Sequence, residues 1–163
     1  MEIERKFTVK ALPEKLGSYK HVEIRQCYLS FGDEKALERR LRQTHDGKNS
    51  RYYLTEKGQG TLSRTENERE ISSEEYFKMY REALTGDIEK TRYYIPLGGA
   101  LTAELDIYHG ALSGLFTVEV EFSDERDAIE FVPPSWFGKD ITEDSGFKNK
   151  CLARFGIPDS FNK

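Results

Sequence analysis

Glu2-Ile3-Glu4-Arg5-Lys6, near the N-terminal end of the chain, has a charged side chain of potential function at every second position. On a β-strand, successive side chains point to opposite faces. The two glutamates and the lysine therefore share one face of a strand, and the isoleucine takes the other. A strand with one charged face is common in ordinary sheets, where that face is solvated. The segment becomes decisive because the same alternation recurs along the chain.

Alternation with a period of two appears in seven further segments, several of them separated by turns that contain glycine. In the last of these segments, Glu119 and Glu121 alternate with apolar residues, so its apolar face is a core face. About eight strands follow from this pattern. They are predicted at residues 1–9, 22–31, 36–44, 51–57, 64–71, 89–96, 102–108 and 116–122.

If these strands form one sheet, one of its faces carries seven cations and eight carboxylates. Ion pairs on a solvated face contribute little, typically under about 1 kcal/mol each, and such a face usually mixes in neutral polar residues. The density of charge therefore favours a functional interior. The cations are Lys6, Arg40, Arg42, Lys57, Arg64, Lys90 and Arg92, and the carboxylates are Glu2, Glu4, Glu66, Glu68, Glu104, Asp106, Glu119 and Glu121.

Closing about eight strands gives a barrel with room for side chains or one small ligand. With the charges inside, the apolar faces point outward and must be covered by helices. Burying so many charges costs several kcal/mol per ion unless they pair or hold an ionic ligand. We therefore predict a mainly β (α+β) fold: a closed eight-stranded antiparallel β-barrel with a charged lumen and a few helices packed outside.

Helices are predicted at three places, each from a cap or an apolar stripe. The best signalled begins at Ser72, which forms a capping box with Glu75, and it ends at Gly86. The remaining predictions are a helix from about Ser145 to Phe155 that docks on the sheet by Phe147, Cys151 and Phe155, a shorter helix across 124–130, and a loop across 132–138 with Trp136 and Phe137 as packing anchors.

Length and composition narrow the class of protein. At 163 residues we expect a single domain across 1–163. A net charge of −4 does not fit a domain that binds nucleic acid. Cys27 and Cys151 make neither a disulfide framework nor a zinc site, and no apolar run approaches the roughly 18 residues of a membrane span. We therefore expect a cytoplasmic protein with no nucleic-acid partner and no membrane association.

The charge pattern also points to a chemistry. Lys and Arg side chains around a cavity match phosphate oxygens, and a ligand that satisfies several of them must carry several negative charges. Carboxylates cannot face such an anion directly, so the pairs Glu2 with Glu4 and Glu119 with Glu121 imply Mg²⁺ or Mn²⁺ between them and the phosphates. A metal that positions water, with cations that neutralise developing charge, predicts hydrolysis of a phosphoanhydride.

The first strand, with its E-x-E-x-K pattern, resembles the opening strand of the CYTH, or triphosphate tunnel metalloenzyme, superfamily. The resemblance continues in order over nearly the whole chain. The further matching segments are Arg40-Leu41-Arg42, Thr55-Glu56-Lys57, Arg64 through Glu68, Glu89-Lys90-Thr91-Arg92, Glu104-Leu105-Asp106 and Val118-Glu119-Val120-Glu121-Phe122.

The resemblance implies an eight-stranded tunnel that binds a triphosphate end-on. It also implies a C-terminal helix that brings Lys148 or Lys150 to one mouth, and we assign Lys150 provisionally. The implied metal ligands are Glu2, Glu4, Glu119 and Glu121; the implied substrate-binding residues are Lys6, Arg40, Arg42, Lys57, Arg64, Lys90, Arg92 and Lys150; and Lys6, Lys57, Lys90 and Arg92 of these are the expected catalytic residues.

Members of the superfamily divide into inorganic triphosphatases, thiamine triphosphatases, class IV adenylate cyclases and RNA 5′-triphosphatases. The cyclase branch usually carries a His-Phe pair before the first strand, whereas only Met1 precedes Glu2 here. The chain most resembles the short bacterial tripolyphosphatases. We therefore expect metal-dependent hydrolysis of inorganic tripolyphosphate, with other triphosphates as poorer substrates, a small-molecule partner and a possible homodimer. The alternatives are an adenylate cyclase, a thiamine triphosphatase and a non-catalytic module that binds polyphosphate.

Overall fold

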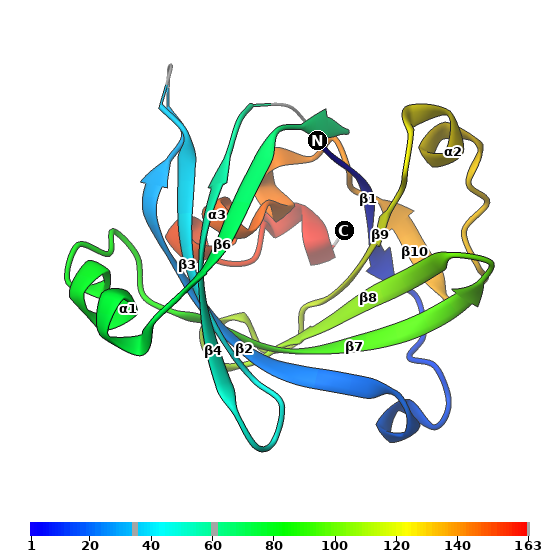
Figure 1. Cartoon of the computed structure of the whole chain (residues 1–163). Helices are drawn as coiled ribbons and strands as arrows, with labels where there is room; N and C mark the ends of the chain where they lie inside the picture. The colour runs from blue at the N-terminus through cyan, green and yellow to red at the C-terminus, as the bar shows by residue number, and fades with distance from the viewer. Residues whose placement is uncertain (34–35, 60–61, 163) are drawn as a thin grey trace.

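A computed structural model describes residues 1–33, 36–59 and 62–162 of the chain. Ten strands form one antiparallel sheet in the order β10-β1-β9-β8-β7-β2-β3-β4-β6, and β5 pairs with β1. The sheet curls into a nearly closed barrel (Figure 1). The strands are β1 (Glu2–Val9), β2 (Lys20–Phe31), β3 (Glu38–His45), β4 (Ser50–Lys57), β5 (Ser63–Arg64), β6 (Glu66–Ile71), β7 (Ile88–Gly98), β8 (Leu101–Tyr108), β9 (Phe116–Glu121) and β10 (Phe137–Asp140).

The barrel closes where β5 and β6 follow one another. β6 pairs with β4, and β5 pairs with β1 through Glu2 opposite Arg64. The backbone N–H of Glu4 also donates to the carbonyl of Leu62, at 3.1 Å. Taken as one bent strand, β5 and β6 complete an eight-stranded ring with β1, β9, β8, β7, β2, β3 and β4. The predicted antiparallel barrel is confirmed, and each of the eight predicted segments is a strand of this ring.

The short edge strand β10 was not predicted. It pairs with β1 beside β5, with Phe7 opposite Asp140 and Val9 opposite Phe137. The predicted loop therefore ends in a strand, but its anchors are where the sequence placed them. Phe137 is buried against Phe7, with ring centroids 5.0 Å apart, and Trp136 packs on Phe137 at 4.6 Å.

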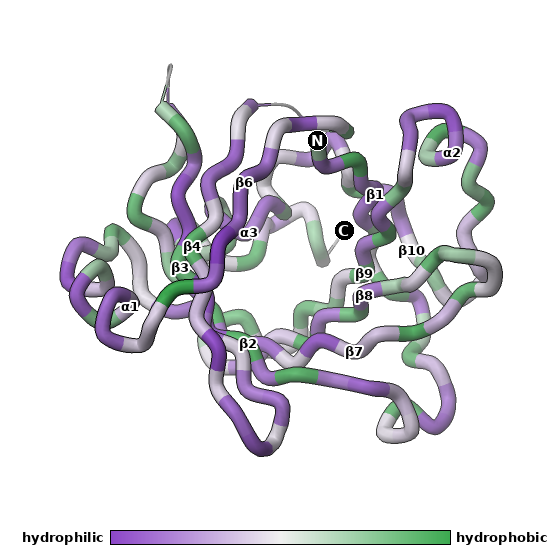
Figure 2. Tube along the Cα trace, in the orientation of Figure 1, coloured by the Kyte–Doolittle hydropathy of each residue, from purple (hydrophilic) through white to green (hydrophobic). Residues whose placement is uncertain are grey.

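Polar and apolar residues alternate along the strands, as Figure 2 shows by colour. The outward faces pack beneath the helices α1 and α2, which lie on the outside of the barrel (Figure 1). Leu41 and Leu54 pack in the cluster that includes Tyr76 of α1, and Val118 and Val120 in the one that includes Ala128 of α2. The helices are α1 (Ser73–Tyr80), α2 (Glu125–Glu130), α3 (Asn149–Phe155), η1 (Leu16–Ser18), η2 (Gly110–Leu112), η3 (Ser145–Phe147) and η4 (Asp159–Asn162).

The first predicted helix begins as expected but is shorter. The Ser72 hydroxyl accepts from the Glu75 N–H at 3.0 Å, which confirms the cap. α1 nevertheless ends at Tyr80, well before Gly86. The chain leaves the helix because the N–H of Leu84 donates to the carbonyl of Tyr28 on β2, at 2.8 Å.

The second predicted helix is broken into η3 and α3. Lys148 between them has an extended backbone, with ψ of 139°, and this break shifts the phase of the apolar stripe. Phe147 is buried as predicted, but Leu152 replaces the later members of the stripe and Phe155 is 74% exposed. The predicted third helix is confirmed as α2, with the Asp124 carboxylate accepting from the N–H of Asp127 at 2.8 Å.

The segment η3–α3 lies across one mouth of the barrel rather than on its outer face (Figure 1). Phe147 and Leu152 pack there in one cluster with Tyr28 and Tyr108. Both tyrosines stand opposite predicted lumen residues, Arg40 and Lys90, so they belong to the inner face. The segment η3–α3, residues 145–155, thus fills one end of the charged lumen, and we call this segment the plug. Within the described part of the chain, no helix has the length and apolarity that crossing a membrane requires.

Candidate active site

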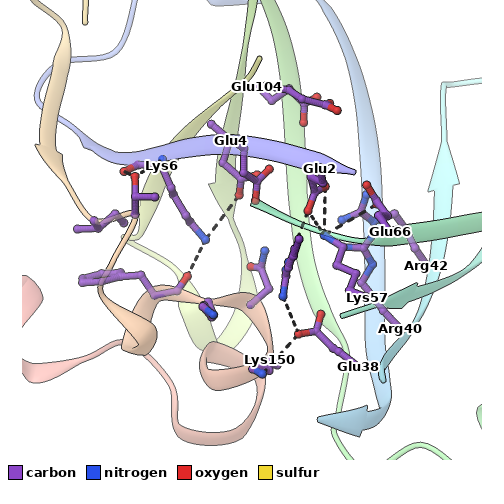
Figure 3. Close-up of a pocket in the computed structure, with 18 of the residues that line it drawn as sticks. Glu2, Glu4, Lys6, Glu38, Arg40, Arg42, Lys57, Glu66, Glu104 and Lys150 are labelled. Atoms are coloured by element: carbon purple, nitrogen blue, oxygen red, sulfur yellow. Dashed lines mark hydrogen bonds and ion pairs between the residues drawn. The ribbon is translucent and has the colours of Figure 1, made fainter. Parts of the chain in front are cut away.

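A cavity of about 320 Å³ occupies the lumen of the barrel. The alternation predicted from sequence places side chains in it correctly, because all the predicted lumen charges except Lys90 and Asp106 line it. Figure 3 shows Glu2, Glu4 and Lys6 projecting side by side from β1 toward this space. The strands therefore bring cations and carboxylates from distant parts of the chain into one polar chamber.

Carboxylates face one another at one side of the chamber. Glu4 of β1 stands directly opposite Glu121 of β9, and Glu104 of β8 stands opposite Glu119. Like charges in directly opposite positions destabilise a sheet. Burial, Glu119 and Glu2 raise the pKa of Glu4 well above its ordinary value, and burial, Glu2 and Glu104 raise that of Glu121. Burial and the neighbouring carboxylates thus both disfavour the ionised forms of Glu4 and Glu121.

Two lysines partly neutralise this group. Lys57 Nζ lies 3.0 Å from Glu2 Oε1, and Lys6 Nζ lies 3.6 Å from Glu119 Oε1. Although burial opposes ionisation, Lys57 lowers the pKa of Glu2, and Lys6 with Arg92 lowers that of Glu119 to about 2. Lys6 also donates to the carbonyl of Phe147 at 2.6 Å, which ties β1 to the plug. Both glutamates are therefore held ionised.

Arginines line the other walls of the chamber, and Arg40 and Arg42 reach it from β3 (Figure 3). Arg40 Nη2 donates to the Thr55 hydroxyl at 3.2 Å, and Glu68 lies at 3.5 Å. Arg92 forms a two-pronged pair with the Asp106 carboxylate, at 2.8 and 2.9 Å. These guanidinium groups are held by the barrel wall with their planes fixed, which suits recognition of an anion with several oxygens.

Lys90, which the sequence placed among the substrate-binding and catalytic residues, does not line the cavity. Its Nζ lies 2.8 Å from Asp106 Oδ2, and both side chains are 0% exposed. Burial and the neighbouring Arg92 and Arg42 lower the pKa of Lys90 to about 7, while Asp106 opposes this. Asp106 thus holds Lys90 and Arg92 from one buried position, and of these two cations only Arg92 reaches the chamber.

The mouth beside the plug is basic. Arg64, Lys148 and Lys150 all line the cavity there, so the structure brings both candidate lysines of the C-terminal segment to it. Lys150 Nζ donates to the carbonyl of Phe31 at 2.9 Å and lies 3.6 Å from Glu38. Arg64 also pairs with Glu38, at 3.4 Å.

Two curated proteins that are similar to this chain are inorganic triphosphatases. One, from Nitrosomonas europaea, is 41% identical over 152 residues, which span 93% of this chain and 96% of that protein. The other, from Acetivibrio thermocellus, is 34% identical over 155 residues, spanning 94% and 93%. The crystal structure of the inorganic triphosphatase NE1496 matches 94% of each chain with a TM-score of 0.65 and 38% identity.

This chain belongs to the inorganic triphosphatase family. The resemblance to the CYTH superfamily predicted from the E-x-E-x-K strand is thereby confirmed. No protein-family model matches the chain.

The carboxylates of this triphosphatase-family chamber fit a hard divalent cation in their chemistry. Glutamate oxygens are the donors that Mg²⁺ and Mn²⁺ prefer, and a bound cation would stabilise the ionised forms of Glu4 and Glu121, which burial and neighbouring carboxylates disfavour. As the side chains stand, no three Asp, Glu, His or Cys residues in the described ranges are gathered into a metal-binding group. Glu2 and Glu119 turn toward lysines instead.

Sequence reasoning missed three buried polar residues of this triphosphatase-family site: Gln26, Tyr28 and Glu38. Glu38 precedes Arg40 and Arg42 at the same spacing of two, so strict use of the alternation would have found it. Gln26 and Tyr28 carry no charge, and a pattern built on charges passes over them. Their position opposite Arg42 and Arg40 on β3 becomes evident only from the register of the sheet.

Proposed function

We propose that this protein hydrolyses inorganic tripolyphosphate to pyrophosphate and orthophosphate, and that the reaction depends on Mg²⁺ or Mn²⁺. The observation that carries the proposal is the chamber itself. Opposed carboxylates, Glu4 with Glu121 and Glu104 with Glu119, share one cavity with fixed guanidinium groups. An anionic ligand alone would be repelled by the first set, and a cation alone by the second. A metal-bound polyanion satisfies both.

The cations bind and orient the phosphates in this proposal. Lys57 and Lys6 act as point charges between phosphate and carboxylate. Four guanidinium groups can each donate two parallel hydrogen bonds to phosphate oxygens: those of Arg40, Arg42, Arg64 and Arg92. Charge that develops on the transferred phosphoryl group is stabilised by donors that are already in place, because ion pairs and hydrogen bonds within the wall hold them. Lys90 does not touch the phosphates in this proposal. It pairs with Asp106 and so helps to keep this carboxylate ionised for its pairing with Arg92.

Glu2, Glu4, Glu119 and Glu121 would hold the metal. A bound divalent cation supplies a Lewis acid for the phosphate oxygens and lowers the pKa of a bound water. Metal binding would therefore change the partners of two lysines. Lys57 and Lys6, which pair with Glu2 and Glu119 here, become available to the phosphates when those carboxylates turn to a cation.

The lining favours an unsubstituted triphosphate over a nucleotide or a thiamine ester. Among the described residues that line the cavity, the aromatic rings are those of Tyr28, Tyr94 and Phe147. Tyr28 is 1% exposed and Phe147 3% exposed, so neither offers a face for stacking a base. Tyr94 is partly buried, and Lys20 Nζ lies over its ring, 5.8 Å from the centroid, so at most one face of this ring is open. Trp136 packs on Phe137 and does not line the cavity. Base stacking typically needs an open aromatic face.

The experiment that tests this function measures release of phosphate and of cyclic nucleotide from tripolyphosphate, ATP, GTP and thiamine triphosphate. Each substrate is incubated with Mg²⁺, Mn²⁺ or a chelator. The proposal expects cleavage of tripolyphosphate above the others, and its loss in chelator. Cyclic AMP from ATP would assign the chain to the cyclases, and tight binding of tripolyphosphate without turnover would make it a binding module.

A possible homodimer stays a prediction.

A further inference from the structure

Gln26 is a fully buried amide on the inner face of β2, directly opposite Arg42 of β3. Its Oε1 accepts from Arg42 Nε at 3.1 Å and from Arg42 Nη2 at 2.8 Å. An arginine side chain can only donate, so the carbonyl end of the amide must face it. The amide nitrogen therefore points the other way, where it donates to Tyr28 Oη at 3.2 Å. One neutral side chain thus orients two groups that line the cavity.

Arg42 differs from its neighbours in the kind of partner that holds it. Arg40 pairs with Glu68, Arg64 with Glu38 and Arg92 with Asp106. Across residues 1–33, 36–59 and 62–162, by contrast, no carboxylate forms an ion pair with Arg42. Two hydrogen bonds orient the Arg42 guanidinium, as two orient that of Arg92, but the acceptor is a neutral oxygen and does not cancel its charge.

The electrostatics agree with this geometry. Burial, together with Arg40 and Arg92, lowers the pKa of Arg42 to about 10. Asp106 acts in the other direction, but the two neighbouring guanidinium groups have the larger effect on Arg42. An arginine in this state gains more from an incoming polyanion than one that must first give up a carboxylate.

We propose that Gln26 is a positioning residue: it aims the Arg42 guanidinium at the anion while leaving its charge intact. The inference deepens the proposed hydrolysis of tripolyphosphate and rests on it. A glutamate at this position would keep the shape but neutralise Arg42, and a methionine would keep most of the volume but release it. The two variants therefore separate the charge from the hydrogen bonds.

The test compares Gln26→Glu and Gln26→Met with wild type in KM and kcat for tripolyphosphate with Mg²⁺. The inference expects Gln26→Glu to raise KM by about tenfold or more with kcat nearly unchanged, because binding is lost equally in ground and transition state. Gln26→Met should raise KM less, by about threefold. Gln43→Glu is the matched control, since it adds the same charge on the outer face of β3, and it should leave KM unchanged.

Three results would overturn the inference: an unchanged KM in both variants, a larger KM in Gln26→Met than in Gln26→Glu, or an equal rise in the Gln43→Glu control. The second is what a purely structural role predicts. If Gln26→Glu fails to fold in a thermal melt, Gln26→Met is combined with Arg42→Met. A double variant no worse than Arg42→Met alone supports action through Arg42, whereas additive losses contradict it.

Calorimetric titration of tripolyphosphate into the metal-free proteins separates this inference from the proposed function. If wild type releases no phosphate from tripolyphosphate in the presence of Mg²⁺ or Mn²⁺, although it binds it, the function proposal fails. The dissociation constants then still test Gln26. Weakening in the order wild type, Gln26→Met, Gln26→Glu supports the positioning role, and equal affinities overturn it.

Discussion

Glu4 stands directly opposite Glu121 across the ladder between β1 and β9. Two carboxylates in such positions cost a sheet about 0.2–1 kcal/mol relative to neutral residues. The neighbouring ladder repeats the arrangement with Glu104 and Glu119, but there each carboxylate has a cation partner: Arg92 lies 2.8 Å from Glu104 and Lys6 lies 3.6 Å from Glu119. A fold that carries this cost between β1 and β9 is expected to recover it when a divalent cation binds to Glu4 and Glu121. Substitutions at these positions should therefore change activity and stability in opposite directions.

The first prediction concerns Glu4→Gln. Metal-dependent cleavage of tripolyphosphate should fall by about a hundredfold or more, since even groups behind a metal ligand change affinity by about 10–100-fold. The melting temperature of the metal-free protein should rise, because the amide buries no charge and removes the repulsion from Glu119 and Glu2. Phosphate release and a thermal melt in chelator measure the two effects. Glu82→Gln, an exposed control, should alter neither, and full activity in Glu4→Gln would remove Glu4 from the metal site.

The second prediction uses two adjacent arginines on opposite faces of β3. Arg40→Ala should lower kcat/KM for tripolyphosphate by about 10²–10³-fold, the usual effect of removing one preorganised donor. Arg39→Ala should leave it nearly unchanged, because Arg39 pairs with Glu56 on the outer face at 3.3 Å. Steady-state kinetics on the pair check this. Equal losses in the two variants would show that the face assignment of β3 does not decide function.

The third prediction concerns pH and Lys90. In the folded protein its pKa is about 7, lowered by burial and by Arg92, whereas an unfolded lysine titrates near 10.4. Between these values the unfolded chain binds the additional proton, so this group makes stability rise with pH. Urea denaturation between pH 7 and pH 9 should show a steeper rise in wild type than in Lys90→Met. Parallel curves for the two proteins would contradict the lowered pKa.

Much of the barrel follows from the sequence because period-two alternation is a local property that survives folding. Each strand needs only its own residues to decide which side chains share a face, and closure then gathers those faces. The inward set was therefore predictable for Arg40 and Arg42, or for Glu119 and Glu121, before any pairing was known.

What the sequence could not supply depends on register and on distant contacts. Nothing in the pattern says that Glu4 meets Glu121 or that Gln26 meets Arg42, since either strand could slide by two residues and keep its faces. The sequence also does not show that Lys90 is buried behind the cavity wall while Arg92 lines the cavity, because both residues follow the same alternation. The plug was misplaced because a single break at Lys148 changes the phase of its helix.

The last prediction decides which lysine of the C-terminal segment serves the substrate. Lys150 Nζ already lies at the mouth, held by the Phe31 carbonyl and near Glu38. Burial, Arg64 and Lys150 itself lower the pKa of Lys148, so Lys148 is the less favourable cation at that mouth until an anion arrives. Lys150→Met should therefore raise KM for tripolyphosphate by about tenfold, since the contact is a charge-assisted one that binds rather than reacts.

Lys148→Met should raise KM less, and Lys139→Met, an exposed lysine of β10, should leave it unchanged. Competition by pyrophosphate, measured as an inhibition constant, separates binding from turnover in the same variants. If the larger KM belongs to Lys148→Met, the substrate contact passes to Lys148. In that case the pairing of Lys150 with Glu38 serves to hold the plug against β2 and β3 rather than to meet the anion.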